Sequence, residues 1–319
     1  MGKRLIAGLV AGALATGASA ATEWTLVDVG TLGGPGSYGA AISNDGTVVG
    51  CADVLPSGAH AFAWKDGVMR DLGLASDATE GSSCALAIND QGLIAGRSAS
   101  REVVIWNGTA VTRLGVQGDV GGLSRFGVLV GTYEVAGGMT RAFRYQNGQL
   151  TPLGTNGAYS AANSVNAKGE IVGTLNGRAT VFSSPLRDLG SGAARGINDR
   201  GMIVGNVSNA YGQPTAFLFR GQMSTLNAPS YSSAVAINER GQVVGSGEGV
   251  YGWLVDNGKY TRLADIPAVI AAGWRHLEPK GINDYGVIVG TGNDAQGNLR
   301  AFVLVPKTGA ESKPLRVGK

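Results

Sequence analysis

The stretch GINDRGMIVG at 196–205 recurs along this chain with the same order of residue types. Each copy holds a small residue, an aliphatic residue, Asn or Ser, two polar residues, Gly, any residue, two aliphatic residues and a closing Gly. The other copies are AISNDGTVVG at 41–50, AINDQGLIAG at 87–96, GLSRFGVLVG at 122–131, SVNAKGEIVG at 164–173, AINERGQVVG at 236–245 and GINDYGVIVG at 281–290. The third copy diverges most. Because repetition at a regular interval marks a repeat architecture, these seven copies are the framework of the fold.

The polar centre of each copy predicts a tight turn between two short strands. Asn and Asp bond their own backbone, and Gly supplies the positive φ that such a turn needs. A calcium site is the alternative for the acidic residues of these turns, Asp45, Asp90, Asp199, Glu239 and Asp284. Each turn offers one carboxylate, whereas calcium takes about six to eight oxygen ligands. We therefore favour turn chemistry and predict no metal site and no cofactor.

Two further elements follow each turn copy. The first alternates bulky with small or polar residues, as in HAFAW at 60–64 and RAFVL at 300–304, and the second resembles VMRDLG at 68–73. The last unit lacks the second element, but TLVDVG at 25–30 has its character and precedes the first turn copy. The pattern predicts an all-β, seven-bladed β-propeller with four strands per blade. The N-terminal strand would complete the last blade as its outermost strand and close the ring.

The N-terminal residues have the pattern of a signal peptide. Lys3 and Arg4 precede an apolar stretch, and Ala18-Ser19-Ala20 supplies small residues for cleavage after Ala20. An uncleaved amphipathic start is the alternative. We expect a signal peptide at 1–20, one propeller domain at 21–306, a polar tail at 307–319, and a secreted or periplasmic protein. No later stretch is long and apolar enough to predict a membrane span.

Charge and cysteine content narrow the partners and the compartment. The whole chain has 26 basic and 23 acidic residues, a net charge of +3, with no basic block. A nucleic-acid binder should carry a concentrated positive face, so we expect no nucleic-acid partner. In an exported protein the two cysteines, Cys51 and Cys84, predict a disulfide, and the bridge would join adjacent blades. We expect a monomer.

The motifs together resemble the bacterial HAF-repeat proteins, which are predicted extracellular repeat proteins. The likeness is carried by HAFAW, RAFRY, TAFLF and RAFVL, by the turn copies, and by DVGTLGG at 28–34, and it covers nearly all of 24–306. It implies export and a propeller-like repeat fold. It implies no activity, ligand or catalytic residue that can be transferred to this chain.

One segment gathers candidate binding residues, Trp274, Arg275, His276 and Glu278. Aromatic and charged groups in a loop suit sugar or anion binding. The plainer interpretation, which we favour, is that Trp274 and Leu277 anchor the last blade while the charged groups are solvated. The long loops at 51–59, 132–140, 206–214 and 291–299 and the connection 265–280 would share one face with this segment.

No catalytic motif is present, so we assign no catalytic residue. The sequence favours a non-enzymatic binding or interaction propeller that presents its loop face to an unidentified protein or glycan partner. The alternative is a polysaccharide-acting hydrolase or lyase with carboxylates around the central channel, because such carboxylates could come from different blades.

Overall fold

The computed structural model describes residues 22–75, 79–155, 157–247 and 249–307. The predicted signal peptide at 1–20, and the predicted tail beyond Lys307, lie outside the described residues. Nearly all the regular secondary structure of the described chain is β-strand, which confirms the all-β prediction. Its helical content is the 3-10 turn η1 (Leu263–Asp265) and the helix α1 (Pro267–Ala271). Within these ranges no helix has the length and apolar character needed to cross a membrane.

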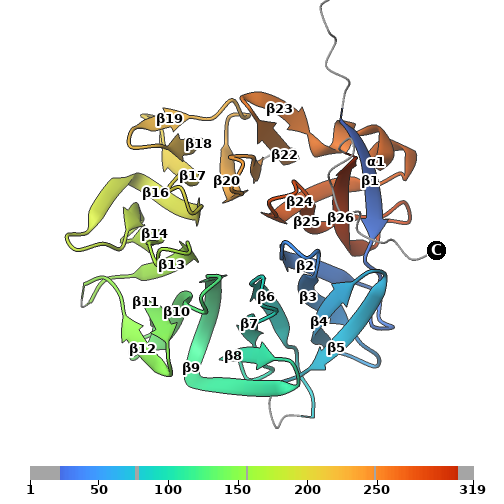
Figure 1. Cartoon of the computed structure of the whole chain (residues 1–319), viewed down its shortest axis with the longest axis horizontal. Coiled ribbons are helices and arrows are strands. Elements are labelled where there is room, and N and C mark those ends of the chain that lie inside the picture. Colours follow the sequence, from blue (N-terminus) through green and yellow to red (C-terminus); the bar gives the residue numbers. More distant parts are fainter. Residues whose placement is uncertain (1–21, 76–78, 156, 248, 308–319) are drawn as a thin grey trace, which may run out of the picture.

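The strands form five antiparallel sheets arranged around a central axis (Figure 1). Three of the sheets have four strands each. The first contains β2 (Ser37–Ile42), β3 (Val48–Asp53), β4 (Ala59–Lys65) and β5 (Val68–Gly73). The second contains β20 (Ser232–Ile237), β21 (Val243–Gly247), β22 (Val250–Asp256) and β23 (Lys259–Arg262). The third contains β24 (Arg275–Ile282), β25 (Ile288–Asn293), β26 (Leu299–Lys307) and β1 (Glu23–Asp28).

The other two sheets have seven strands each. One runs through β6 (Cys84–Ile88), β7 (Ile94–Arg97), β8 (Glu102–Asn107), β9 (Ala110–Leu123), β10 (Leu129–Val135), β11 (Met139–Gln146) and β12 (Gln149–Pro152). The other runs through β13 (Ser160–Val165), β14 (Ile171–Leu175), β15 (Arg178–Val181), β16 (Arg187–Ile197), β17 (Ile203–Ser208), β18 (Pro214–Phe219) and β19 (Met223–Thr225).

Two long strands explain the larger sheets. The first part of β9 pairs with β8 up to Gln117, and its second part pairs with β10 from Gly118 onward. Strand β16 changes partner from β15 to β17 between Ser191 and Gly192. Each long strand is therefore the last strand of one four-strand group and the first strand of the next.

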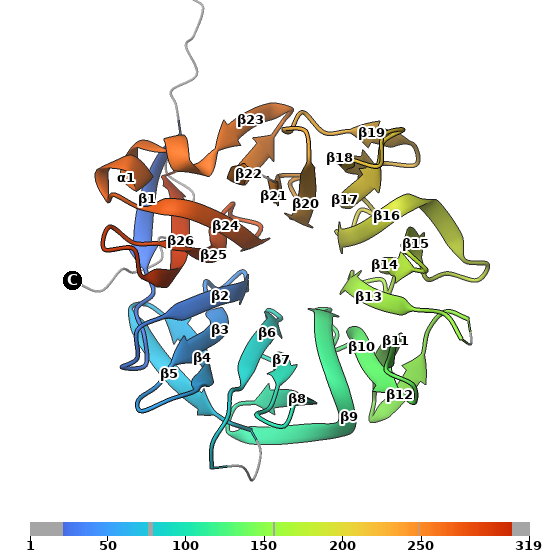
Figure 2. The ribbon, with the colours of Figure 1, turned by 180° about the vertical axis from the view of Figure 1, so that it is seen from behind.

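The predicted pairing of the two ends of the chain is confirmed. Strand β1 lies antiparallel to β26, with Leu26 opposite Leu304 and Asp28 opposite Phe302. Figures 1 and 2 show these two strands side by side, although they come from opposite ends of the sequence. Strand β1 is at the edge of its sheet, which is the position predicted for it.

The hydrophobic core lies between neighbouring sheets rather than in one central mass. One cluster joins Phe62 and Trp64 of β4 to Val289 of β25 and Val303 of β26. The bulky residues of the HAFAW-type elements fill such layers, and the fully buried ones are Phe62, Phe143, Phe217, Trp253 and Phe302. Burial of each aromatic side chain removes about 150–250 Å² of surface from water.

The closing Gly of each copy is required by close backbone packing. A Cβ on Gly205 would overlap the carbonyl oxygen of Ala193 on the paired strand, and a Cβ on Gly96 would overlap that of Cys84. The same overlap exists at Gly50, Gly131, Gly173, Gly245 and Gly290. Any larger residue at these positions would push the first two strands of its group apart.

Candidate functional site

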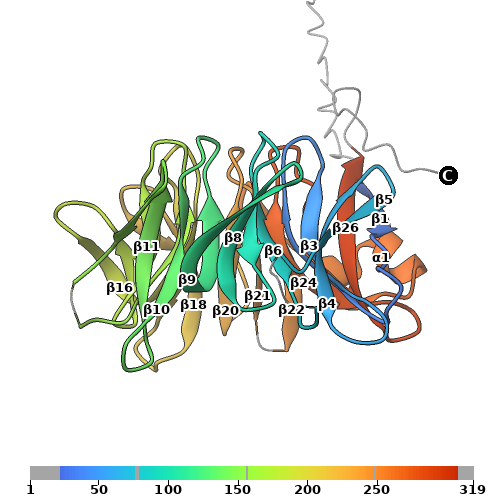
Figure 3. The same ribbon diagram turned by 90° about the horizontal axis from the view of Figure 1, so that it is seen from below.

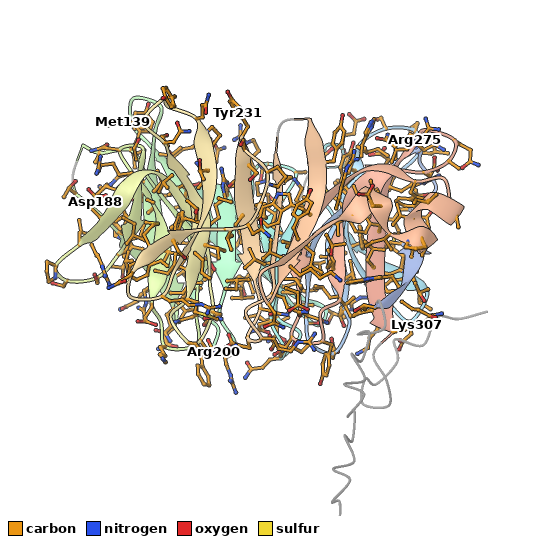
Figure 4. All side chains as sticks on the ribbon, turned by 90° about the horizontal axis from the view of Figure 1, so that it is seen from above. Met139, Asp188, Arg200, Tyr231, Arg275 and Lys307 are labelled. Carbon is orange, nitrogen blue, oxygen red and sulfur yellow. A yellow bond between two sulfur atoms is a disulfide. The ribbon has the colours of Figure 1, made fainter. Side chains whose placement is uncertain are left out.

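The central channel has two different ends. On one side lie the Asn turns, and we call this side the turn face. On the other side the inner strands begin and the loops between second and third strands project, and we call this side the loop face. Figure 4 shows Met139, Tyr231 and Arg275 on the loop face and Arg200 on the turn face, and Figure 3 shows the strands running between the two.

The turn-face end of the channel opens into a cavity of about 590 Å³. This volume is in the range of small-molecule sites. Its lining comes from the turns of all the repeat copies and includes Asn44, Asp90, Arg125, Asp199, Glu239 and Asp284.

The turn asparagines link most of the turns to the next one around this mouth. The Asn198 side-chain oxygen accepts hydrogen bonds from Arg200 N and Met202 N within its own turn. Its Nδ2 donates to the backbone oxygen of Asn238 in the next turn at 3.0 Å. Equivalent links join Asn89 to Ser124, Asn166 to Asn198, Asn238 to Asn283, and Asn283 to Ser43. The last of these joins the final repeat to the first.

A second circle of hydrogen bonds engages the carboxylates. Asp199 N donates to Glu239 Oε1 at 2.6 Å, and Glu239 N donates to Asp284 Oδ1 at 2.9 Å. Burial raises the pKa of Glu239, and the neighbouring carboxylates of Asp199 and Asp284 raise it further. The acidic turn residues therefore act as acceptors for neighbouring backbone N–H groups. Within the described ranges no group of three or more His, Cys, Asp or Glu side chains is placed to hold a metal ion.

Two of the turns, the first and the third, depart from this pattern. Asp45 does not line the cavity and instead accepts a hydrogen bond from Ser43 Oγ at 2.5 Å within its own turn. In the divergent third copy, Arg125 and Phe126 replace the usual acidic and polar residues, and Phe126 is 63% exposed. The mouth therefore has one cationic and aromatic sector in an otherwise acidic and amide-rich rim.

A collar of aliphatic residues separates the mouth from the rest of the channel. The residues immediately before the turn positions line both the mouth and a second cavity of about 220 Å³, which we call the bore. They are Ile42, Ile88, Leu123, Val165, Ile197, Ile237 and Ile282.

The loop face carries the disulfide. Cys51 on β3 is bonded to Cys84 on β6, with the Cα atoms 4.7 Å apart. The bridge joins two different sheets near the loop face, as predicted. The described part of the chain has no free cysteine.

The predicted binding residues lie together on the loop face but not with their side chains in one cluster. Trp274 is 8% exposed and packs edge-on against Phe302, with the ring centroids 6.3 Å apart. His276 is exposed, and its ring packs against that of Tyr251 with the centroids 4.2 Å apart. The Nδ1 atom of His276 lies 3.2 Å from Asn293 Oδ1. Arg275 is exposed.

The remaining charged residue of that segment is paired. Lys280 Nζ donates to the exposed carboxylate of Glu278 at 3.2 Å. Trp274 and Leu277 thus anchor the segment in the core, and the groups left for a ligand are Arg275 and His276.

Exposed aromatic and large aliphatic side chains gather on the loop face. Tyr211 is 86% exposed at the tip of the β17–β18 loop. The others on this face are Tyr38, Leu55, Tyr159, Tyr231, Tyr251 and Leu299. The five tyrosines of this set were not singled out in the sequence, because a tyrosine before a strand is equally typical of a core position. The signal available was their position at strand entries and loop tips.

Comparison with known proteins supports the fold alone. No protein-family model matches the chain, and no curated protein matches it. Among solved structures, the β-propeller domain of the trilobed protease of Pyrococcus furiosus has a TM-score of 0.57 at 9% identity, covering 86% of this chain and 99% of that one. A gluconolactonase of Xanthomonas campestris has a TM-score of 0.45 at 11% identity, and the match covers 88% of this chain and 89% of that one. The first likeness shows that the chain has a β-propeller fold.

Proposed function

We propose that the chain is an exported, seven-bladed propeller that binds a partner on its loop face without catalysing a reaction. The blade count follows if the two long strands, β9 and β16, are divided where they change partners. Pairing of β1 with β26 and the bond from Asn283 to Ser43 support a ring closed between the last repeat and the first. The repeat motifs make membership of the HAF-repeat proteins part of this proposal.

Export is supported by the disulfide and by the N-terminal pattern. A bond between Cys51 and Cys84 persists in an oxidising compartment such as the periplasm or the cell exterior. Lys3, Arg4 and the small residues up to Ala20 have the order of a cleavable signal. The near-balanced charge supports a partner other than nucleic acid, and we expect a monomer.

The observation that carries the binding proposal is the display of tyrosines on the loop face. Tyrosine combines a large apolar ring with a hydroxyl, so it contributes strongly to recognition of proteins and glycans. Tyr211 and Tyr231 come from adjacent strand groups, and Gln213 Nε2 donates to the Tyr231 hydroxyl. On the turn face, by contrast, the carboxylates are engaged by backbone N–H groups.

An enzymatic role at the turn-face mouth is the second candidate. Burial and the neighbouring carboxylates of Asp199 and Asp284 raise the pKa of Glu239, and a carboxyl group with a raised pKa is the kind of general acid that glycoside hydrolysis uses. Phe126 supplies an exposed aromatic ring at the same mouth. This candidate predicts release of reducing sugar from polysaccharide that Glu239→Gln abolishes.

The test is glycan-array binding and pull-down with the exported protein and matched variants. We expect Tyr211→Ser with Tyr231→Ser to weaken partner binding at least about tenfold, because buried interface tyrosines contribute about 2 kcal/mol or more. His276→Ala should weaken it less. Tyr285→Ser, which removes an exposed tyrosine on the turn face, should leave binding unchanged.

Two results would contradict the proposal. Equal loss in the Tyr285→Ser control would place the partner elsewhere. Release of reducing sugar that depends on Glu239 would replace binding by catalysis.

A further inference from the structure

Every innermost strand has an irregularity at the same place. The register with the second strand skips the residue three positions before the turn residue, which is a β-bulge. The bulged residues are Ala40, Leu86, Gly121, Asn163, Arg195, Val235 and Lys280. Bulges re-aim side chains and are frequent beside functional sites.

Five of the seven bulged residues line the bore, on the loop side of the collar, whereas Asn163 and Arg195 do not. Most of them are apolar or small and line the bore, as do Ala40, Leu86 and Val235. The polar ones are Asn163, Arg195 and Lys280. Asn163 Nδ2 donates to the backbone oxygen of Ala194, and Lys280 is paired with Glu278. Among the charged bulged residues, Lys280 has a carboxylate partner, and Arg195 has none within the described part of the chain.

The Arg195 guanidinium is held at one nitrogen. Its Nε donates to Ser233 Oγ at 3.0 Å and to Asn206 Oδ1 at 3.4 Å. Ser233 Oγ in turn lies 3.1 Å from Asn206 Oδ1. These bonds join β16 and β17 to β20 of the next sheet and fix the orientation of the side chain.

The other end of the guanidinium is open. In the part of the chain that the structure describes, no carboxylate lies within ion-pair distance of Arg195, and neither Nη atom has a hydrogen-bond partner. Partial desolvation against the neighbouring strands lowers the pKa of Arg195, although the residue is exposed to solvent. An arginine anchored at Nε presents its two Nη groups as a fork that fits the two oxygens of a carboxylate.

Polar groups suited to a sugar surround this seam between the sheets. Tyr231 precedes Ser233 at the entry of β20 and is 43% exposed. Its hydroxyl is bonded by Gln213 of the β17–β18 loop, so it bridges the same two sheets as Arg195. Hydroxyl and amide side chains, with one aromatic ring, match a polyhydroxylated ligand better than an apolar peptide.

We propose that Arg195 binds the carboxylate of an acidic saccharide at the seam between β16, β17 and β20, with Asn206, Gln213, Tyr231 and Ser233 contacting the sugar. This proposal rests on loop-face binding and names the chemical class of the ligand. Uronic acid units are the simplest sugars with this chemistry.

The experiment measures binding of trigalacturonic acid and of its neutral methyl ester by calorimetry at low salt. We expect the ester to bind at least about tenfold more weakly, since a hydrogen bond from the guanidinium to a charged carboxylate is stronger than one to a neutral ester. Arg195→Gln should remove this difference, and Arg195→Lys should restore part of it because it keeps the charge without the fork. Arg200→Gln, on the turn face, is the matched control and should bind as the unchanged protein does.

A second measurement guards against a folding defect in the variants. In the unchanged protein, trigalacturonic acid should shift the ¹⁵N resonance of Arg195 Nε, and the methyl ester should not. Glycan binding that is indifferent to the carboxylate and to Arg195 would overturn this inference and leave loop-face binding intact. Failure of every acidic saccharide would overturn it too, as would tighter Arg195-dependent binding of hexaglutamate, which would identify an acidic peptide. Absence of any glycan or protein partner would count against the proposed function itself.

Discussion

At the scale of single residues, the turn asparagines perform two tasks. Asn198 is 3% exposed, closes its own turn with its oxygen, and joins the next turn through its Nδ2. Asn209 forms the same local bonds in an exposed loop, to Tyr211 N at 2.9 Å and Gln213 N at 3.0 Å. Its Nδ2 stays within the loop, bonded to Gln213 Oε1. Comparison of Asn198 with Asn209 therefore distinguishes the stability gained from turn formation from that gained by the link between repeats.

Replacement of the two asparagines should therefore have unequal costs. Asn198→Ala leaves the backbone N–H groups of Arg200 and Met202 without partners and removes one of the two hydrogen bonds to the backbone oxygen of Asn238, so we expect a loss of about 2–4 kcal/mol in the free energy of unfolding. Asn209→Ala should cost about 1 kcal/mol or less, because water replaces the lost bonds. Urea unfolding of both variants measures the difference. Equal losses would show that the links between turns add no stability.

The turn residues were predictable from sequence and Arg195 was not. Asn, Asp and Gly have local conformational preferences, so the sequence GINDRGMIVG predicts a turn without knowledge of the rest of the fold. Arg195 has its role through Ser233 of the next sheet and through a bulge that no alternation of residues reveals. Contacts between repeats depend on the angle between sheets, which a repeat pattern does not contain.

At the scale of elements, the disulfide staples β3 to β6 across a boundary between sheets. The bonded cysteines are separated by 33 residues of sequence, and part of that segment joins the two sheets. The cysteine count and the expectation of export were enough to predict the bridge. Two reduced cysteines at these positions would have behaved as small apolar side chains.

Removal of the bridge should destabilise the protein by an amount set by loop closure. For a loop of this length the chain-entropy relation gives about 3–4 kcal/mol, and we expect Cys51→Ser with Cys84→Ser to lose about that much. Thermal unfolding with and without reductant measures it. Reductant should lower the Tm of the unchanged protein and leave that of the double variant unaltered. Two alkylatable thiols in the non-reduced protein would contradict the bridge outright.

The connection 265–280 shows where element-level prediction stops. It was expected as the longest loop of its face, and it contains α1 and the start of β24. Trp274 could have been a ligand platform or an anchor, and the sequence pattern is the same for both. The contact of Trp274 with Phe302, nearly thirty residues later in the chain, shows that Trp274 is an anchor.

At the scale of the whole molecule, the two ends of the described chain meet. Glu23 is opposite Lys307 in the β1–β26 register, and the two side chains form an ion pair with Lys307 Nζ 3.2 Å from Glu23 Oε2. The missing element of the last repeat predicted this arrangement. Sharing of β9 and β16 between strand groups was not predicted, because the linkers there continue straight as strand instead of turning.

This geometry makes a circular permutant the test of ring closure. Lys307 and Glu23 are neighbours on antiparallel strands, so a short flexible linker from one to the other forms a hairpin. New ends can be opened between Gly137 and Gly138, which lie exposed at a loop tip. We expect this permutant to fold with a free energy of unfolding within about 1 kcal/mol of the unchanged protein, since distant loop changes cost little.

The matched variant lacks Glu23–Asp28 and keeps every other residue. Its last sheet would have an open edge at β26, and Leu26 would no longer cover the core beside Phe302 and Leu304. We expect this variant to unfold at lower urea concentration and with a smaller m-value, because a native state without the β1–β26 pairing buries less surface. A deletion as stable as the full chain would mean that β1 only lies against the last sheet. A permutant that fails to fold would mean that the order of synthesis, rather than the closed geometry, holds the two ends together.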